Sequence, residues 1–143
     1  MIFLLDNGTF DSFNYNRWTV NPADMVGDNM LRDLQQSGLF RAVFSYHTPD
    51  EGRYVVQGGV EDFFLKMGKT GRTAVAALVI TLEDTKQHAA TRRILYQKKY
   101  REERLLGTPT AEGYCRAMSL ALEALSRRIT TDIYAGIINA EKC

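Results

Sequence analysis

The sequence has few of the residues from which disulfide frameworks and metal sites are built. Its 143 residues include two cysteines, Cys115 and Cys143, and two cysteines neither define a disulfide framework nor fix the redox compartment. The two histidines, His47 and His88, lie in turn-like segments. Neither has a second ligand-type residue at a metal-binding spacing, so we expect both to be solvated loop residues.

Long apolar runs and an excess of one charge are also missing. No stretch reaches the ~18 consecutive apolar residues of a membrane-spanning helix. The apolar start, Met1–Leu5, is too short for the core of a signal peptide, and it has neither a basic leader nor a small-residue cleavage site. Eighteen basic and seventeen acidic residues nearly cancel. The overall charge therefore does not indicate a nucleic-acid or anionic-membrane partner.

The length and composition are those of one globular domain. Hydrophobic residues make up 45% of the sequence and charged residues 24%, which is enough apolar material to bury a core. We therefore treat residues 1–143 as a single domain. The chain opens inside an apolar run, Ile2–Leu5, so we expect the domain to be truncated at its N-terminus. Ile2–Leu5 and Thr9–Tyr15 are candidate strands.

The first segment with strong helix signals is 22–37. Asn21 is a suitable N-cap before Pro22, and Gly38 is placed to end the helix in the left-handed conformation. An apolar stripe with helical spacing lies between these signals and comprises Val26, Met30, Leu31 and Leu34.

A second and longer helix is predicted for residues 109–138. Thr108 is the candidate N-cap, and Pro109 would occupy the first helical position. The apolar stripe of this helix comprises Ala111, Cys115, Met118, Leu122, Leu125, Ile129 and Ile133. Because Cys115 falls on this stripe, we expect its thiol to be packed in the core.

Three strand-like segments lie between the helices. Tyr54–Lys66, Thr73–Glu83 and Arg92–Glu103 are joined by short polar turns, and such connections favour antiparallel neighbours. Thr73–Glu83 is apolar on both faces, which is typical of a central strand. The pair Gly58-Gly59 interrupts the first strand and predicts a bulge or a place where another backbone or side chain approaches closely.

These elements predict an α+β fold of two layers. We expect a largely antiparallel sheet of four or five strands, one of them a short strand at Arg41–Tyr46, with the helices 22–37 and 109–138 packed on one face. The second face of Thr73–Glu83 would be covered in part by this chain or by another subunit.

The sequence contains no catalytic constellation. Met67–Arg72 includes Gly-Lys-Thr, but it lacks the first glycine of a phosphate-binding loop and links two strands. The adjacent carboxylates Glu61-Asp62 and Glu102-Glu103 lie on strands, where neighbouring side chains point to opposite faces. We therefore predict a protein that is not an enzyme, without catalytic residues, a metal site or a cofactor.

A basic cluster marks the third strand-like segment. Tyr96 and Tyr100 are interleaved with its cations, which are Arg92, Arg93, Lys98, Lys99, Arg101 and Arg104. We take Arg93, Lys99 and Arg101 as candidate partner-binding residues. One hypothesis is that residues 92–104 bind single-stranded nucleic acid through stacking and phosphate contacts. The alternative is that the charges only protect a solvated strand from edge pairing.

Several segments together resemble a known family by their order and spacing. They are Tyr15-Asn16-Arg17-Trp18, Leu34–Phe40, Tyr54–Phe63, Ala76–Asp84 and the long Ala/Leu-rich C-terminal helix. In this order they are similar to the ABC-type transport auxiliary lipoprotein component family. Its members are envelope lipoproteins of Gram-negative bacteria associated with MCE-type lipid transport systems.

The resemblance implies a non-catalytic periplasmic accessory protein, anchored to the outer membrane in full-length relatives. Its implied partners are MCE-domain or other ABC-transport system proteins, together with phospholipid and further copies of itself. It implies no catalytic residues and no cofactor. The chain departs from the family at its start, because it contains neither the signal peptide nor the lipobox cysteine of those relatives.

Overall fold

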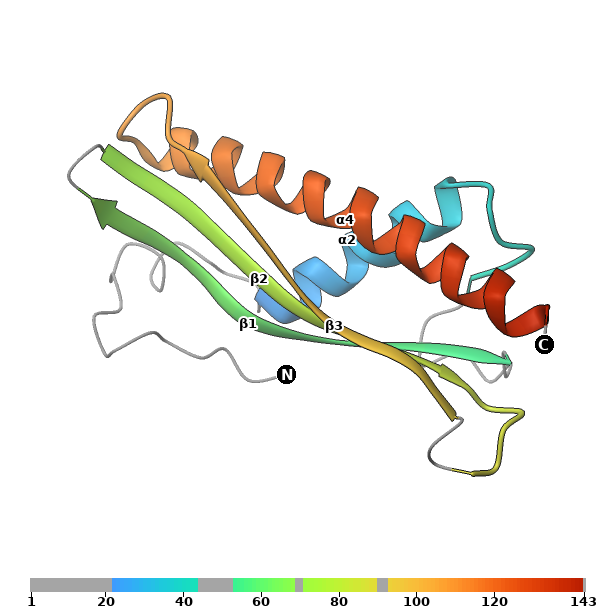
Figure 1. Cartoon of the computed structure of the whole chain (residues 1–143). Helices are drawn as coiled ribbons and strands as arrows, with labels where there is room; N and C mark the ends of the chain where they lie inside the picture. The colour runs from blue at the N-terminus through green and yellow to red at the C-terminus, as the bar shows by residue number, and fades with distance from the viewer. Residues whose placement is uncertain (1–21, 44–52, 69–70, 90–92, 143) are drawn as a thin grey trace.

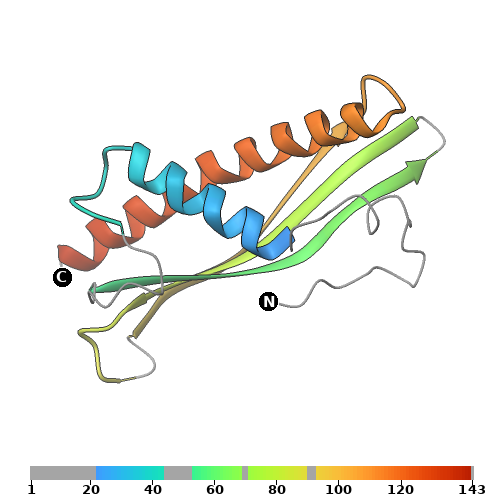
Figure 2. The same ribbon diagram turned by 180° about the vertical axis from the view of Figure 1, so that it is seen from behind.

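The computed structural model describes residues 22–43, 53–68, 71–89 and 93–142. Its elements in chain order are α2 (Pro22–Gln36), β1 (Tyr54–Gly68), β2 (Gly71–Asp84), β3 (Ile94–Leu105) and α4 (Ala111–Glu141). The strands form a long, twisted antiparallel sheet in the order β1-β2-β3. Both helices lie on the same side of this sheet (Figures 1 and 2). The α+β class and the two-layer arrangement are therefore confirmed.

The described part of the sheet has three strands, and the predicted four or five is corrected accordingly. Two of the candidate strands, Ile2–Leu5 and Thr9–Tyr15, lie outside the described residues. The third, Arg41–Tyr46, is described only as far as Val43 and forms no strand there. The carbonyl of Val43 instead accepts a hydrogen bond of 3.0 Å from the Gln35 side chain, which holds this segment against the end of α2.

The central position of β2 explains its apolar character on both faces. Alternate residues of β2 from Ala74 to Leu82 join the core beneath the helices. The intervening Val75 and Ala77 point to the other face and are also fully buried. We call this other side of the sheet, turned away from α2 and α4, the outer face.

The sequence predicted a bulge or a close approach at Gly58-Gly59. The close approach is present, because a Cβ atom at Gly58 would lie 3.3 Å from Ile80 Cδ1, but the bulge lies further along β1. Both glycines pair regularly with β2, and the register shifts between Val60 and Asp62. Val60 and Phe63 are both buried in the core, although residues three apart on a regular strand point to opposite faces. The extra residue of the bulge lets both side chains reach the helix side of the sheet.

α2 ends as predicted by its sequence. Gly38 has a φ of 73°, the left-handed conformation that glycine adopts without a steric penalty. The Ser37 hydroxyl donates a hydrogen bond of 2.7 Å to the Leu34 carbonyl and accepts one from the Leu39 amide. Beyond this turn, the Phe40 ring packs edge-on against Tyr134 of α4, with ring centroids 6.2 Å apart.

The start of α4 corrects the predicted cap. Thr110, not Thr108, is the N-cap, and its hydroxyl accepts a hydrogen bond of 3.1 Å from the Gly113 amide. The helix therefore begins two residues after Pro109. Gly113 lies so close to the Thr108 carbonyl that a methyl group there would overlap it. The chain before the cap is thus folded back on the first turn of the helix.

The buried stripe of α4 also differs from the predicted one at its beginning. Cys115 is exposed, whereas Tyr114 is buried, so the prediction that Cys115 packs in the core is wrong. Residue 114 is four positions before Met118 and residue 115 is three, and both spacings fit a helical stripe. The packing of α4 on the sheet buries Tyr114 and leaves Cys115 exposed.

None of the described helices combines the length and apolarity needed to cross a membrane.

Candidate functional site

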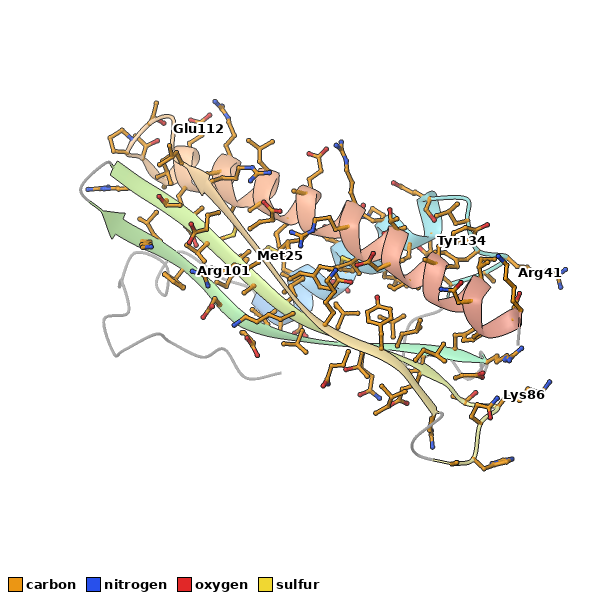
Figure 3. All side chains as sticks on the ribbon, viewed as in Figure 1. Met25, Arg41, Lys86, Arg101, Glu112 and Tyr134 are labelled. Atoms are coloured by element: carbon orange, nitrogen blue, oxygen red, sulfur yellow. The ribbon has the colours of Figure 1, made fainter. Side chains whose placement is uncertain are left out.

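The three candidate cations of the basic cluster lie beside carboxylates. Arg101 and Lys99 are paired across the sheet with Ala77 and Val79, which places both side chains on the outer face. Lys99 Nζ lies 2.7 Å from Glu61, and Arg101 lies 2.8 Å from Asp62 and 3.1 Å from Glu103. Figure 3 labels Arg101 among the sticks of the sheet.

Arg93 precedes β3 and lies against the end of β2. Its Nε is 3.7 Å from Glu83, a residue of the outer face. A carboxylate of the sheet lies beside each of Arg93, Lys99 and Arg101. The outer face therefore carries charges of both signs around these three cations, and not an excess of positive charge. Charge of both signs on one face suits a protein partner with a complementary pattern.

The remaining described cations of the cluster lie on the helix side. Lys98 Nζ is 3.2 Å from Asp132 of α4. Arg104 and Arg128 both contact Glu102, each at 2.8 Å. Arg92 lies outside the described residues. Neighbouring residues of β3 thus send their charges to opposite faces, and the cluster is divided between two surfaces.

This division does not favour the nucleic-acid hypothesis. Binding of single strands by a sheet requires aromatic rings and cations on one accessible face. Tyr100 is fully buried beneath α4, and Tyr96 is half-buried on the same side. The described rings of β3 therefore lie opposite Lys99 and Arg101.

A hydrogen-bonded cluster joins β3 to α4 on the helix side. The Tyr100 hydroxyl donates to Asp132 Oδ2 at 2.6 Å and lies 3.5 Å from the Tyr96 hydroxyl. Burial and the bond to Asp132 raise the pKa of Tyr100, so it remains a protonated donor. The hydrogen bond from Tyr100 lowers the pKa of Asp132, and that from Lys98 adds to the effect.

A groove runs beside this cluster, between the start of β3 and the C-terminal half of α4. Its volume is about 570 Å³. The residues that line it are Leu95, Tyr96, Gln97, Lys98, Asp132, Ala135, Gly136, Asn139 and Ala140. It combines a cation, an anion and an aromatic wall with small helix residues.

A smaller groove of about 290 Å³ lies where α2 meets α4 above β2. Its walls include Val26, Met30 and Leu122, and the Ser126 hydroxyl donates to Asp33 Oδ2 at 2.6 Å along it. This bond ties the two helices together. Two polar side chains of this groove, Asp33 and Ser126, are thus already engaged in holding α2.

The residues weighed in the sequence for chemistry do not converge in the described chain. His88 is exposed, and His47 lies outside the described residues. The expectation that Glu61 and Asp62 point to opposite faces is wrong, because the bulge between Val60 and Asp62 brings both into contact with cations of the outer face. In the part of the chain that the structure describes, no three histidine, cysteine or carboxylate side chains gather as a metal site would require.

Sequence reasoning missed Asp132, the residue that links Lys98 and Tyr100. Two signals were present. Asp132 is the one carboxylate between Glu123 and Glu141, and it adjoins Ile133 of the buried stripe. Its partners are 32 and 34 residues away in the sequence, so only the packing of α4 on β3 reveals the contact.

The fold matches solved structures. The crystal structure of protein XCC0632 from Xanthomonas campestris, assigned to the domain family DUF330, superimposes with a TM-score of 0.77. It is 16% identical, and the match covers 88% of this chain and 69% of that one. The hypothetical protein CT253 from Chlamydia trachomatis matches with a TM-score of 0.63 and 13% identity, over 85% of this chain and 90% of that one.

Sequence comparison adds nothing to this likeness. No protein-family model matches the chain, and no curated protein does. At 16% and 13% identity the structural matches establish a shared fold and no shared activity. They do establish that other proteins adopt this overall fold.

The hydrogen bond from Tyr100 to Asp132 leads to a prediction with a defined pH dependence. Tyr100→Phe removes the donor, and we expect the free energy of unfolding at pH 7 to fall by about 1.5 kcal/mol, since a third of Asp132 is exposed. The pKa of Asp132 is lowered from its ordinary 3.8. The hydrogen bond therefore contributes its full stabilisation above pH 3.8, and this contribution is lost as the pH falls through the lowered pKa that Asp132 has in the folded protein.

Urea denaturation at pH 7 and at pH 3 measures this effect. The difference between wild type and Tyr100→Phe should narrow at the lower pH. Tyr96→Phe is the matched control, because its hydroxyl lies 3.5 Å from that of Tyr100 and is not bonded to the carboxylate in the structure. An equal loss in both variants, unchanged by pH, would contradict the assignment.

Proposed function

We propose that this protein is a non-catalytic periplasmic accessory component of an ABC/MCE-type lipid or organic-solvent transport system, of the kind whose full-length relatives are anchored to the outer membrane. It acts through contacts with other proteins of the system and with lipid. The observation that carries the proposal is the order of the sequence segments Leu34–Phe40, Tyr54–Phe63 and Ala76–Asp84 before an Ala/Leu-rich helix, which resembles the ABC-type transport auxiliary component family.

The fold is consistent with this role. The three segments form the end of α2, most of β1 and the second half of β2, so the resemblance follows the elements of one packed unit. The match to XCC0632 covers 88% of this chain with a TM-score of 0.77. The likeness supports the proposal at the level of the fold.

The outer face is the surface we propose for protein contacts. This face carries two cation–carboxylate pairs from adjacent positions, Lys99 with Glu61 and Arg101 with Asp62. Such a pattern gives specificity and faster encounter with a partner of complementary charge. Because these ion pairs are largely solvated, their residues can be changed with little effect on folding.

Affinity capture of the full-length tagged protein from its own organism, followed by mass spectrometry and lipid analysis, tests the proposal. We expect an MCE-domain or other transport-system protein, with lipid, to be captured. Lys99→Ala combined with Arg101→Ala should reduce that capture, and Arg127→Ala, on the exposed side of α4, should not. Capture of no transport-system protein, or retention of the protein in the cytoplasm, would reject the role.

A further inference from the structure

The groove between β3 and α4 places opposite charges on its two walls. Lys98 rises from β3 and Asp132 from α4, with 3.2 Å between Nζ and Oδ2. Their side chains are 52% and 36% exposed. Ion pairs exposed to this degree contribute little to stability, so a ligand that supplies both charges can replace the contact between them.

Asp132 is held in place independently of Lys98. Its Oδ2 accepts the 2.6 Å hydrogen bond from the buried Tyr100 hydroxyl. Within the described residues its second oxygen, Oδ1, accepts no hydrogen bond in the structure. The carboxylate is therefore positioned by a buried donor and still has an oxygen for a ligand to contact.

Small side chains line the α4 wall of the groove and leave its space unfilled. At Gly136 a Cβ atom would lie 2.9 Å from Leu82 Cδ2 and 3.5 Å from the Tyr96 ring, so glycine lets the helix approach the sheet closely. Ala135 and Ala140 flank this point, and the Asn139 amide is exposed beside them. The groove thus offers an anion, a cation and an amide around a volume of about 570 Å³.

We infer that this groove binds the headgroup of a phospholipid that carries a primary amine. The ammonium of the lipid donates to Asp132 Oδ1. Lys98 turns away from Asp132, and its ammonium donates to the lipid phosphate together with the Asn139 amide. This inference rests on the proposed function, which supplies the lipid. Charge complementarity favours this headgroup class over two others. A headgroup without a cation would place its negative phosphate near the Asp132 carboxylate with no positive charge between them. A quaternary amine has no N–H to donate to that carboxylate.

The test is a titration of the full-length protein with dihexanoyl phosphatidylethanolamine below its micelle concentration, followed by NMR of the backbone amides. We expect shifts in residues 95–98 and 132–140. Affinity for the glycerol and choline headgroups should be about tenfold lower, since each loses a charged hydrogen bond. Equal affinity for all three headgroups, or shifts elsewhere, would overturn the inference.

Variants locate the site. Lys98→Gln and Asp132→Asn should each weaken binding about tenfold. Lys99→Gln is the matched control, because it removes the same charge one residue away on the outer face and should leave affinity within about twofold. If Asp132→Asn lowers stability, Ala135→Leu replaces it, since it fills the groove without changing any charge; binding that survives Ala135→Leu and Lys98→Gln contradicts the site.

This outcome can be separated from that of the proposed function. Capture of a transport-system protein without selective binding of the amine headgroup would reject the groove and leave the accessory role intact. Selective binding without any transport-system partner would reject the role in transport and retain the groove as a lipid site.

Discussion

Replacement of Phe63 by alanine is expected to lower the free energy of unfolding by about 3–5 kcal/mol, which makes it the most damaging single change we predict. Phe63 is fully buried beneath the helices on β1, an edge strand of the described sheet, directly after the bulge. Its partner across the sheet is Ala76, whose small side chain cannot move into the space. Most of the cavity left by the ring would therefore remain empty.

Phe64→Ala is the matched control for this prediction. Phe64 is the same residue type one position later, it points to the outer face opposite Val75, and it is only partly buried. We expect its loss to cost less than about 2 kcal/mol, because less apolar surface is re-exposed to water. Urea denaturation followed by circular dichroism measures both. A larger loss for Phe64→Ala would mean that the bulge places the other phenylalanine in the core.

Gly113→Ala is the second prediction with a large effect. In most exposed helix positions this change stabilises a protein, but here the new methyl group would overlap the backbone carbonyl of Thr108. A backbone atom cannot move aside by changing rotamer, so the first turn of α4 and the Thr110 cap must shift. We expect a net loss of about 2–3 kcal/mol from strain and the weakened cap.

Gly27→Ala tests whether this loss arises from the overlap. Gly27 also lies inside a helix, α2, and a Cβ atom there would meet nothing within 4 Å. We expect this variant to be more stable than the wild type by about 0.5–1 kcal/mol, since alanine is the better helix former. The melting temperatures of the two variants should therefore move in opposite directions, and parallel changes would contradict the proposed contact.

Local signals in the sequence account for the elements that form. Gly38 ended α2 as predicted, since left-handed backbone is favourable for glycine whatever surrounds it. The two-sided apolar character of Thr73–Glu83 identified the central strand, because each face of such a strand must be buried. Val60 and Phe63 are apolar and three residues apart, and this spacing indicates a bulge between them. The pair Gly58-Gly59, directly before Val60, suggested a different position.

The cap and the buried stripe of α4 needed the packed structure. Thr108 and Thr110 flank the same proline, and either could cap a helix; the fold of the preceding loop against Gly113 decided between them. Tyr114 and Cys115 both fit the stripe, and the packing of α4 on the sheet buried the tyrosine and left the cysteine exposed. Periodicity defines an apolar side of a helix only to within about one residue.

The sequence by itself determined that this is an α+β protein built on an antiparallel meander, because periodicity, turns and caps depend on residues close together in the chain. Only the tertiary structure decided which charges meet. Asp132 reaches Lys98 and Tyr100, and Glu61 and Asp62 reach Lys99 and Arg101, through strand register and helix docking. Such contacts join residues more than thirty positions apart, and no local preference specifies them.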